Sequence, residues 1–227
     1  MRPPHAYRLK NQQLWLTSAR SIFWDEEKAL IVADLHFGKT GHFRKSGLAV
    51  PPAVYKEDLQ RLLEQIQYFQ PKQLIVVGDL FHSRFNKELE LFKKWRSSFP
   101  ELAIHLIKGN HDILEENWYE DAGIFVSHPR LDRNHFHFVH DINDRSAGND
   151  NDSMKVKSNP YYISGHLHPG IRISGAGKQS LCFPCFYFGK HFAVLPAFSR
   201  FTGVALIDPE RSEHVFAIVQ DEVMQIQ

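Results

Sequence analysis

The chain carries five short clusters of Asp, Asn and His, and each cluster closely follows a run of apolar residues. Carboxylate, amide and imidazole groups bind divalent metals, and a charge at the end of a buried segment needs a partner. Clusters brought together could therefore hold metal ions for hydrolysis, whereas any one alone could be a solvated turn with a capping Asp. The clusters are Asp34 and His36; Asp79 and His82; Asn110, His111 and Asp112; His140; and His166 and His168.

The segments that must position these clusters alternate in character. Short apolar runs predict strands, and segments 51–71 and 86–100 place apolar residues at helical spacing, which predicts helices. This alternation indicates an α/β fold, with clusters about 25 to 45 residues apart, the length of a strand, helix and strand unit. Because loops at the carboxyl ends of the strands form the site in such folds, one pocket could hold every cluster. The expected strands lie within 29–36, 73–82, 102–112, 136–141 and 161–169.

Length and composition predict a single globular domain, 1–227. The chain has 227 residues, of which 43% are hydrophobic and 23% charged, enough to bury a substantial core. The formal net charge is only +1, so any binding of nucleic acid would have to rest on a local basic patch. No stretch has the character of a signal peptide or the length of a membrane span, so we expect a cytoplasmic protein without membrane association.

The two cysteines, Cys182 and Cys185, form the sequence "CFPC". They could be a redox pair or half of a zinc site, but a structural zinc site needs four ligands and no second cysteine pair is present. We expect two buried free thiols instead.

The composition of the clusters predicts which metals they bind. A set of two Asp, one Asn and four His drawn from these clusters suits borderline divalent cations, so we expect two ions, manganese first, with iron or zinc as alternatives. Two such ions bring four positive charges, and two carboxylates and a hydroxide would leave a residual of about +1 for a phosphate group. Neutral ligands therefore keep the pair attractive to an anionic substrate.

The motifs "DLH", "GDLFH", "GNHD", a single His and "GHLH", in that order, resemble the signature of the calcineurin-like metallophosphoesterase superfamily. The resemblance covers residues from about 29 to 170. It implies a four-layer αββα sandwich, with two mixed β-sheets flanked by helices and both metals at the strand ends. It also implies a hydroxide between the two metals as the nucleophile.

The same resemblance assigns roles by position. The resemblance places Asp34, His36 and His168 on the first metal, places Asn110, His140 and His166 on the second, and makes Asp79 the bridge. His111 would face the substrate as a proton donor or as a stabiliser of the transition state, and Asp112 could orient His111. A helix cap is the alternative role for Asp112.

One departure and three further segments indicate a subfamily. Protein phosphatases of the superfamily carry a second Asp followed by Arg-Gly where this chain has His82-Ser83-Arg84, which disfavours that activity. The segments "GDLFHS", "HFGKTGHFRKSGLAVP" and "LPAFSRFTG" resemble the bacterial DNA-ligase-associated phosphoesterases, which are found beside ligase and helicase genes.

That likeness implies a phosphodiesterase or nuclease in DNA repair, with a phosphodiester such as DNA as substrate and a DNA ligase or helicase as a candidate associate. A phosphodiesterase or phosphatase of small nucleotides, and a non-catalytic scaffold, remain open as alternatives. The candidate substrate-binding residues are Lys39, Arg44, Lys45, His82 and Arg84, although the basic stretch could equally be a solvated turn.

Two segments are expected to play no part in metal binding. Residues 141–160 are rich in Asn, Asp and Ser, which predicts a long loop that either covers the site or has no chemical role. His135 and His137 alternate with Phe136 and Phe138, so they should point away from the face that carries His140.

Overall fold

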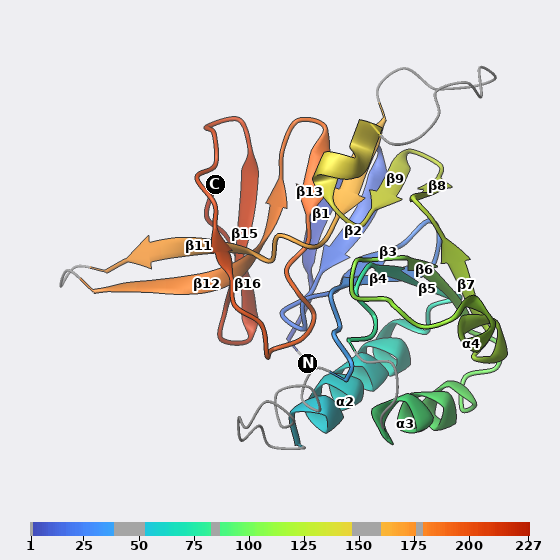
Figure 1. The fold of residues 1–227 in the computed structure, drawn as a ribbon. Helices are drawn as coiled ribbons and strands as arrows, with labels where there is room; N and C mark the ends of the chain where they lie inside the picture. The colour runs from blue at the N-terminus through green and yellow to red at the C-terminus, as the bar shows by residue number, and fades with distance from the viewer. Residues whose placement is uncertain (1, 39–52, 83–86, 147–159, 176–178) are drawn as a thin grey trace.

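The computed structural model describes residues 2–38, 53–82, 87–146, 160–175 and 179–227. Within these ranges two mixed β-sheets pack face to face, and α-helices cover the outer face of the first sheet (Figure 1). The α/β fold of two packed mixed sheets that the sequence predicts is therefore confirmed.

The first sheet has seven strands in chain order. The first three pairings are antiparallel and the last three are parallel. The first two strands of the parallel part are apolar runs buried on both faces, as expected for strands covered by helices on one side and a second sheet on the other. The strands are β1 (His5–Leu9), β2 (Gln12–Leu16), β3 (Ile22–Trp24), β4 (Ala29–Ala33), β5 (Gln73–Val77), β6 (Ala103–Ile107) and β7 (Ile124–Ser127).

The second sheet is built from the carboxyl-terminal half of the chain and has nine strands. Seven follow the order β14-β11-β12-β13-β10-β9-β8, and β15 pairs with both β12 and β16. The strands are β8 (Arg130–Arg133), β9 (Phe136–Val139), β10 (Tyr161–Ser164), β11 (Pro169–Ser174), β12 (Ser180–Phe188), β13 (Phe192–Val194), β14 (Ala205–Leu206), β15 (His214–Val219) and β16 (Glu222–Gln225).

Within the described ranges, three α-helices pack on the first sheet: α2 (Ala53–Phe69), α3 (Lys87–Arg96) and α4 (Glu116–Asp121). The helices predicted within 51–71 and 86–100 correspond to α2 and α3. In the described part of the chain, the second sheet has beside it only the short 3-10 helix η1 (Ile142–Ser146), next to β9 and β10. In the described residues, the helical layer expected on the second sheet is thus represented by η1 alone.

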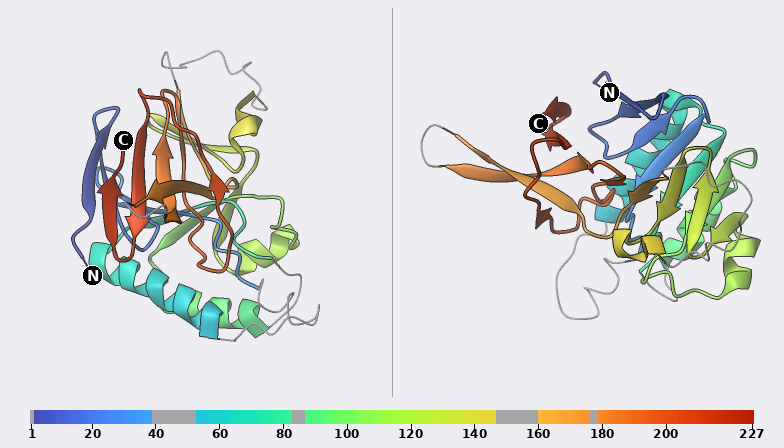
Figure 2. Two further views of the ribbon diagram at one scale, coloured as in Figure 1. Left: turned by 90° about the vertical axis from the view of Figure 1, so that its left-hand side faces the viewer. Right: turned by 90° about the horizontal axis from the view of Figure 1, so that it is seen from above.

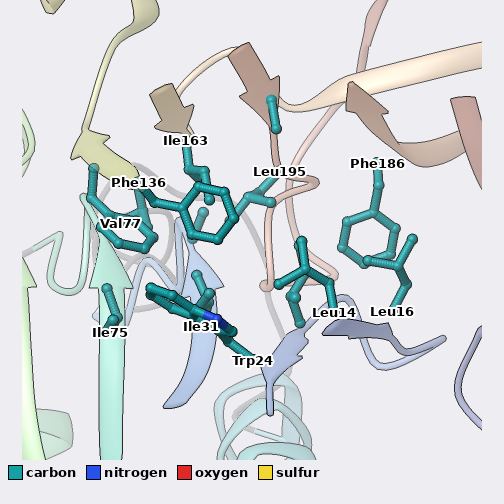
Figure 3. Close-up of a cluster of buried hydrophobic side chains, with 14 of the residues drawn as sticks. Leu14, Leu16, Trp24, Ile31, Ile75, Val77, Phe136, Ile163, Phe186 and Leu195 are labelled. Carbon is teal, nitrogen blue, oxygen red and sulfur yellow. The ribbon is translucent and has the colours of Figure 1, made fainter. Parts of the chain in front are cut away.

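The two faces of β4, β5 and β6 support two separate apolar cores. Alternate residues such as Ile31, Ile75 and Val77 face the second sheet, where they pack with Phe136 and Ile163 (Figure 3). This alternation follows from the twofold side-chain period of a strand. The carboxyl ends of strands from both sheets are thereby held at fixed positions relative to each other.

On the opposite face, the intervening strand residues pack against the helices. Val32 and Val76 contact a cluster that contains Leu62 and Ile66 of α2 and Phe92 of α3. The helical spacing of these apolar residues is the reason that α2 and α3 bury one stripe each.

Strands β11 and β12 form a hairpin that extends away from the rest of the molecule (Figure 2). Cys182 lies on its exposed part, whereas Cys185 is fully buried where β12 joins the sheet. The prediction of two buried thiols is therefore wrong for Cys182, because β12 runs beyond the body of the sheet.

This difference predicts unequal thiol reactivity. Burial raises the pKa of the Cys185 thiol to about 12, so at neutral pH it offers almost no thiolate and no access. A thiol reagent should therefore modify one cysteine, Cys182, in the native protein and both cysteines in denaturant. Mass spectrometry of the labelled peptides measures this, and rapid native labelling of Cys185 would contradict the packing of β12.

The segment predicted as a loop, 141–160, differs from the prediction at its start, where η1 forms. Asp141 supports this turn, since its Oδ1 accepts a hydrogen bond from the Asn143 backbone amide at 2.9 Å. Residues 147–159 lie outside the described ranges. The prediction that this loop either covers the site or has no chemical role therefore also lies outside the described part of the chain. None of the described helices combines the length and apolar character that a bilayer span requires.

Candidate metal centre

The predicted ligands follow the carboxyl ends of five strands that belong to two different sheets. Three strands, β4, β5 and β6, come from the first sheet, and β9 and β10 come from the second. A hydrogen bond ties the sheets together within the centre, since the His166 amide donates to Asp34 Oδ2 at 2.9 Å. The centre therefore lies where the two sheets meet.

The first group of ligand atoms joins Asp34 and His36 to His168. His36 Nε2 lies 3.4 Å from His168 Nε2, and His168 Nε2 lies 3.7 Å from Asp34 Oδ2. Each of the three offers one ligand atom, and these atoms all lie within 4.8 Å of one another. Asp34 and His36 are buried while His168 is half-buried, so the group is open on one side.

The second group joins Asp79 to His140 and His166, again with ligand atoms within 4.8 Å of one another. Asn110 belongs beside it, because its Oδ1 lies 2.9 Å from His140 Nε2. His166 Nδ1 lies 3.1 Å from the same His140 nitrogen. The structure thus brings all seven predicted ligands to one place.

Asp79 stands between the two groups. Its Oδ2 lies 3.9 Å from His36 Nδ1, and its Oδ1 lies 3.6 Å from His140 Nε2. A carboxylate that faces one group with each oxygen is placed to bridge two cations. This is the position that the sequence predicts for it.

The backbone at the centre is strained in a way that the sequence does not reveal. Five of the seven predicted ligands have a left-handed backbone, with φ between 47° and 65°. Such conformations cost about 1–3 kcal/mol each for residues with a side chain, and they persist where surrounding structure imposes them. The five residues are Asp34, His36, Asp79, His166 and His168.

Two glycines allow the loops to approach this closely. A Cβ on Gly78, whose φ is +78°, would lie 1.8 Å from His140 Nδ1. A Cβ on Gly109 would lie 2.2 Å from Asp79 Oδ1. Each glycine directly precedes a predicted ligand in the chain, and its missing side chain leaves room for a predicted ligand that follows another strand.

The donor set fits a pair of cations. Asp34 Oδ1 is buried and accepts no hydrogen bond among the described residues, which is costly for a carboxylate oxygen unless a cation binds there. Ligand atoms that each lie about 2.1 Å from one cation lie roughly 3–4 Å from each other. The distances given above between ligand atoms of the same group are of this size. The mixture of imidazole, carboxylate and amide suits manganese, iron or zinc.

His111 lies beside the first group. Its backbone amide donates a hydrogen bond to Asp79 Oδ1 at 3.0 Å, and its ring centroid is 5.6 Å from that of His36. The centroid of the His82 ring lies 4.1 Å from that of the His111 ring, so two imidazole rings lie next to each other on this side of the centre. His111 is half-buried, so its ring is partly accessible.

Asp112 acts on the loops and not on the His111 ring. Its two carboxylate oxygens accept hydrogen bonds from the backbone amides of Phe81 and Gly109, both at 2.9 Å. No hydrogen bond joins it to the His111 side chain among the described residues. Burial raises the pKa of Asp112 to about 7, while these two amides act in the opposite direction. Asp112 therefore connects the loop after β5 with the loop after β6.

Replacing this connection should cost stability. Asp112→Ala leaves the amides of Phe81 and Gly109 without an acceptor in a buried place, so the free energy of unfolding should fall by about 2–3 kcal/mol. Urea unfolding of the metal-free protein measures the change. Asp121→Ala removes an exposed carboxylate from the end of α4 and should change it by less than about 0.5 kcal/mol. Equal effects of the two substitutions would contradict the role given to Asp112.

Several predicted substrate-binding residues cannot be placed. Lys39, Arg44, Lys45 and Arg84 lie outside the described residues. His137 points away from the centre, as predicted, and its Nδ1 lies 2.6 Å from Asp132 Oδ1.

Comparison with known proteins identifies this arrangement. The family model of the calcineurin-like phosphoesterases matches residues 28–158, which contain five of the seven ligands. The chain belongs to this family. The superfamily resemblance predicted from the motifs is thereby confirmed, and with it a phosphoester hydrolase that binds metals.

Among solved structures, this phosphoesterase is similar to the Pseudomonas putida nuclease MPE, with 26% identity and a TM-score of 0.78. The match covers 98% of this chain and 100% of that one. An E. coli phosphoesterase, Yfce, matches with 11% identity, covering 87% of this chain and 97% of its own, at a TM-score of 0.43. No curated protein sequence matches the chain.

The phosphoesterase has a groove of about 490 Å³ beside the second group of ligands. Three carboxylates, Glu116, Asp141 and Asp144, line it together with one lysine, Lys108. Asp141 also lies close to the centre, with its Oδ2 at 3.9 Å from His166 Nε2. This side of the centre is therefore acidic.

Proposed function

We propose that this phosphoesterase holds two divalent cations and hydrolyses phosphodiesters, with nucleic acid as its substrate. The observation that carries the proposal is the position of Asp79, which faces the first group of ligands with one oxygen and the second group with the other. When bound, two such cations polarise a phosphoryl group and activate a water molecule as the nucleophile.

The protein's own residues supply the rest of the chemistry. Two carboxylates and five neutral ligands would leave a metal pair with net positive charge, which favours a phosphate group over a neutral substrate. His111 is placed to donate a proton to the leaving oxygen or to stabilise the charge that develops on the phosphoryl oxygens. Asp112 keeps the His111 loop in register with the Asp79 loop.

The similarity to a nuclease over nearly the whole chain supports nucleic acid as the substrate. Manganese is the metal we expect first, because the ligands combine oxygen and nitrogen donors. A role in DNA repair and an association with a DNA ligase or helicase are proposals that rest on the subfamily resemblance of the motifs. The cytoplasmic location is a proposal that rests on the sequence without that resemblance.

A substrate panel tests this function. The manganese-loaded protein is given bis-p-nitrophenyl phosphate, p-nitrophenyl phosphate, a cyclic nucleotide and a single-stranded oligonucleotide. We expect hydrolysis of the diester reporter and of the oligonucleotide, with little action on the monoester. Preference for the cyclic nucleotide would favour a small-nucleotide phosphodiesterase, and inactivity towards every substrate would favour a non-catalytic scaffold.

A further inference from the structure

The loop formed by residues 199–204, here called the 199–204 loop, is attached at both ends to ligands of the first group. The Ser199 amide donates a hydrogen bond to the Asp34 carbonyl at 3.2 Å, and the Ala205 amide donates to the His168 carbonyl at 2.9 Å. Both bonds are to residues predicted to hold the first metal. The loop is therefore fixed relative to that metal position.

Two arginines, the half-buried Arg20 and the buried Arg61, hold the segment that leads into the loop. Arg20 donates to the carbonyls of Ala197 and Ser199, and Arg61 donates to the carbonyl between them, that of Phe198. Arg61 is paired with Asp58 at 2.9 Å. A segment held by three consecutive carbonyls can present its side chains in a defined geometry.

The charge of this cluster is unbalanced. Among the described residues, Arg20, Arg61 and Arg200 lie near two carboxylates, Asp58 and Glu57. Burial, together with the positive charge of Arg61 and Arg200, lowers the pKa of Arg20 to about 10. The surface of the loop therefore favours an anion.

The loop displays a basic and an aromatic side chain next to each other. Arg200 is exposed, and Phe201 is 37% exposed. The Phe201 amide donates to Ser199 Oγ at 3.2 Å, which fixes the turn that carries both side chains. Val204 and Leu167 are 39% and 43% exposed; Leu167 precedes His168 in the chain, and Val204 precedes Ala205, whose amide donates to the His168 carbonyl.

The opposite side of the centre is unfavourable for a polyanion. Among the described residues, the groove beside the second group carries three carboxylates and one lysine, and carboxylates repel phosphate groups. A strand bound between the metals would therefore continue over the 199–204 loop. An arginine binds phosphate, and an exposed aromatic ring stacks on bases or packs against sugars.

We propose that the 199–204 loop binds the nucleotide next to the scissile phosphate, with Arg200 on its phosphate and Phe201 on its base or sugar. This inference rests on the proposed function, because it assumes a nucleic-acid substrate. It assigns substrate positioning to residues that contribute no ligand atom to the metals.

Two substrates separate positioning from chemistry. Bis-p-nitrophenyl phosphate has no neighbouring phosphate, sugar or base, whereas a single-stranded oligonucleotide has all three. With the manganese-loaded full chain, Arg200→Ala and Phe201→Ala should each raise the KM for the oligonucleotide by at least about fivefold. Both should leave kcat/KM for the small reporter within about twofold of the wild-type value, because neither residue touches the reacting group.

Conservative substitutions and the salt dependence of KM test the two proposed contacts separately. Phe201→Leu should lose oligonucleotide binding as Phe201→Ala does, and Phe201→Trp should retain it, because a stacked base needs an aromatic face. Arg200→Ala should lower the slope of log KM against log salt by about 0.7, the value for one phosphate contact on a single strand. Phe201→Ala should leave that slope unchanged.

Matched controls lie far from the centre. Arg8→Ala removes an exposed arginine from β1, three strands away from β4, and Tyr68→Ala removes an exposed ring from the end of α2 that precedes β5. Neither should change the KM for the oligonucleotide.

The outcomes distinguish this inference from the proposed function. Normal reporter hydrolysis with an unchanged oligonucleotide KM in both loop variants would overturn the role of the loop and leave the proposed function intact. Equal losses on both substrates would also overturn it, since they would show an effect on the metal site. A wild-type protein that hydrolyses neither substrate would overturn both proposals.

Discussion

Asp79→Asn should reduce turnover of a diester reporter by about a thousandfold or more and should lower the manganese content of the protein. The amide has almost the same shape as the carboxylate, but it has one oxygen where two are needed. The NH2 group of the asparagine would face either His36 or His140. One of the two ligand groups would therefore lose the oxygen that Asp79 supplies to it. The expected loss of activity therefore follows from the lost negative charge and the lost ligand oxygen, because asparagine fills the same space as aspartate.

The measurement combines steady-state kinetics with metal analysis of the same sample. We expect about two manganese ions per wild-type chain and at most about one in Asp79→Asn. Asp221→Asn removes an exposed carboxylate between β15 and β16 and should change neither quantity. Full activity and full metal content in Asp79→Asn would contradict the bridging position.

His111→Ala should lower kcat by about a hundredfold or more while the metal content stays at the wild-type level. His111 touches the ligand cluster through its backbone amide, which alanine keeps, and through a ring that holds no metal in this assignment. The separation of kcat from metal content therefore distinguishes a catalytic side chain from a ligand.

The leaving group tells which role the imidazole plays. A proton donor matters most when the leaving oxygen is a strong base, so His111→Ala should cost more on a nucleotide substrate than on a p-nitrophenyl ester. A loss of the same size on both substrates would favour stabilisation of the phosphoryl oxygens instead. His135→Ala, which changes a histidine outside the centre, should retain full activity.

Much of the centre can be predicted from the sequence because chemistry and position coincide there. Apolar runs such as those before Asp34 and Asp79 predict buried strands, and the polar residues that follow them must converge at the carboxyl edge. The structure brings together all seven predicted ligands, from Asp34 to His168, on that principle. The spacing could not show that His140 and His166 come from a second sheet, because parallel neighbours in one sheet give the same spacing.

Other features depend on contacts that no local pattern encodes. The left-handed backbone at Asp34 and Asp79 is imposed by loops from different strands. Asp112 looked like a partner of its neighbour His111, but its acceptors are used by amides 31 and 3 residues away in sequence. The sequence predicts no role for Arg200 and Phe201 individually, although both lie in the segment "LPAFSRFTG", which resembles the DNA-ligase-associated phosphoesterases.

The most direct test of the central claim is an anomalous diffraction map of a crystal grown or soaked with manganese. The account predicts two peaks per chain, one among Asp34, His36 and His168 and one among Asn110, His140 and His166, with the Asp79 carboxylate between them. A single peak, or manganese bound elsewhere with the Asp79 carboxylate turned away from both groups, would contradict it.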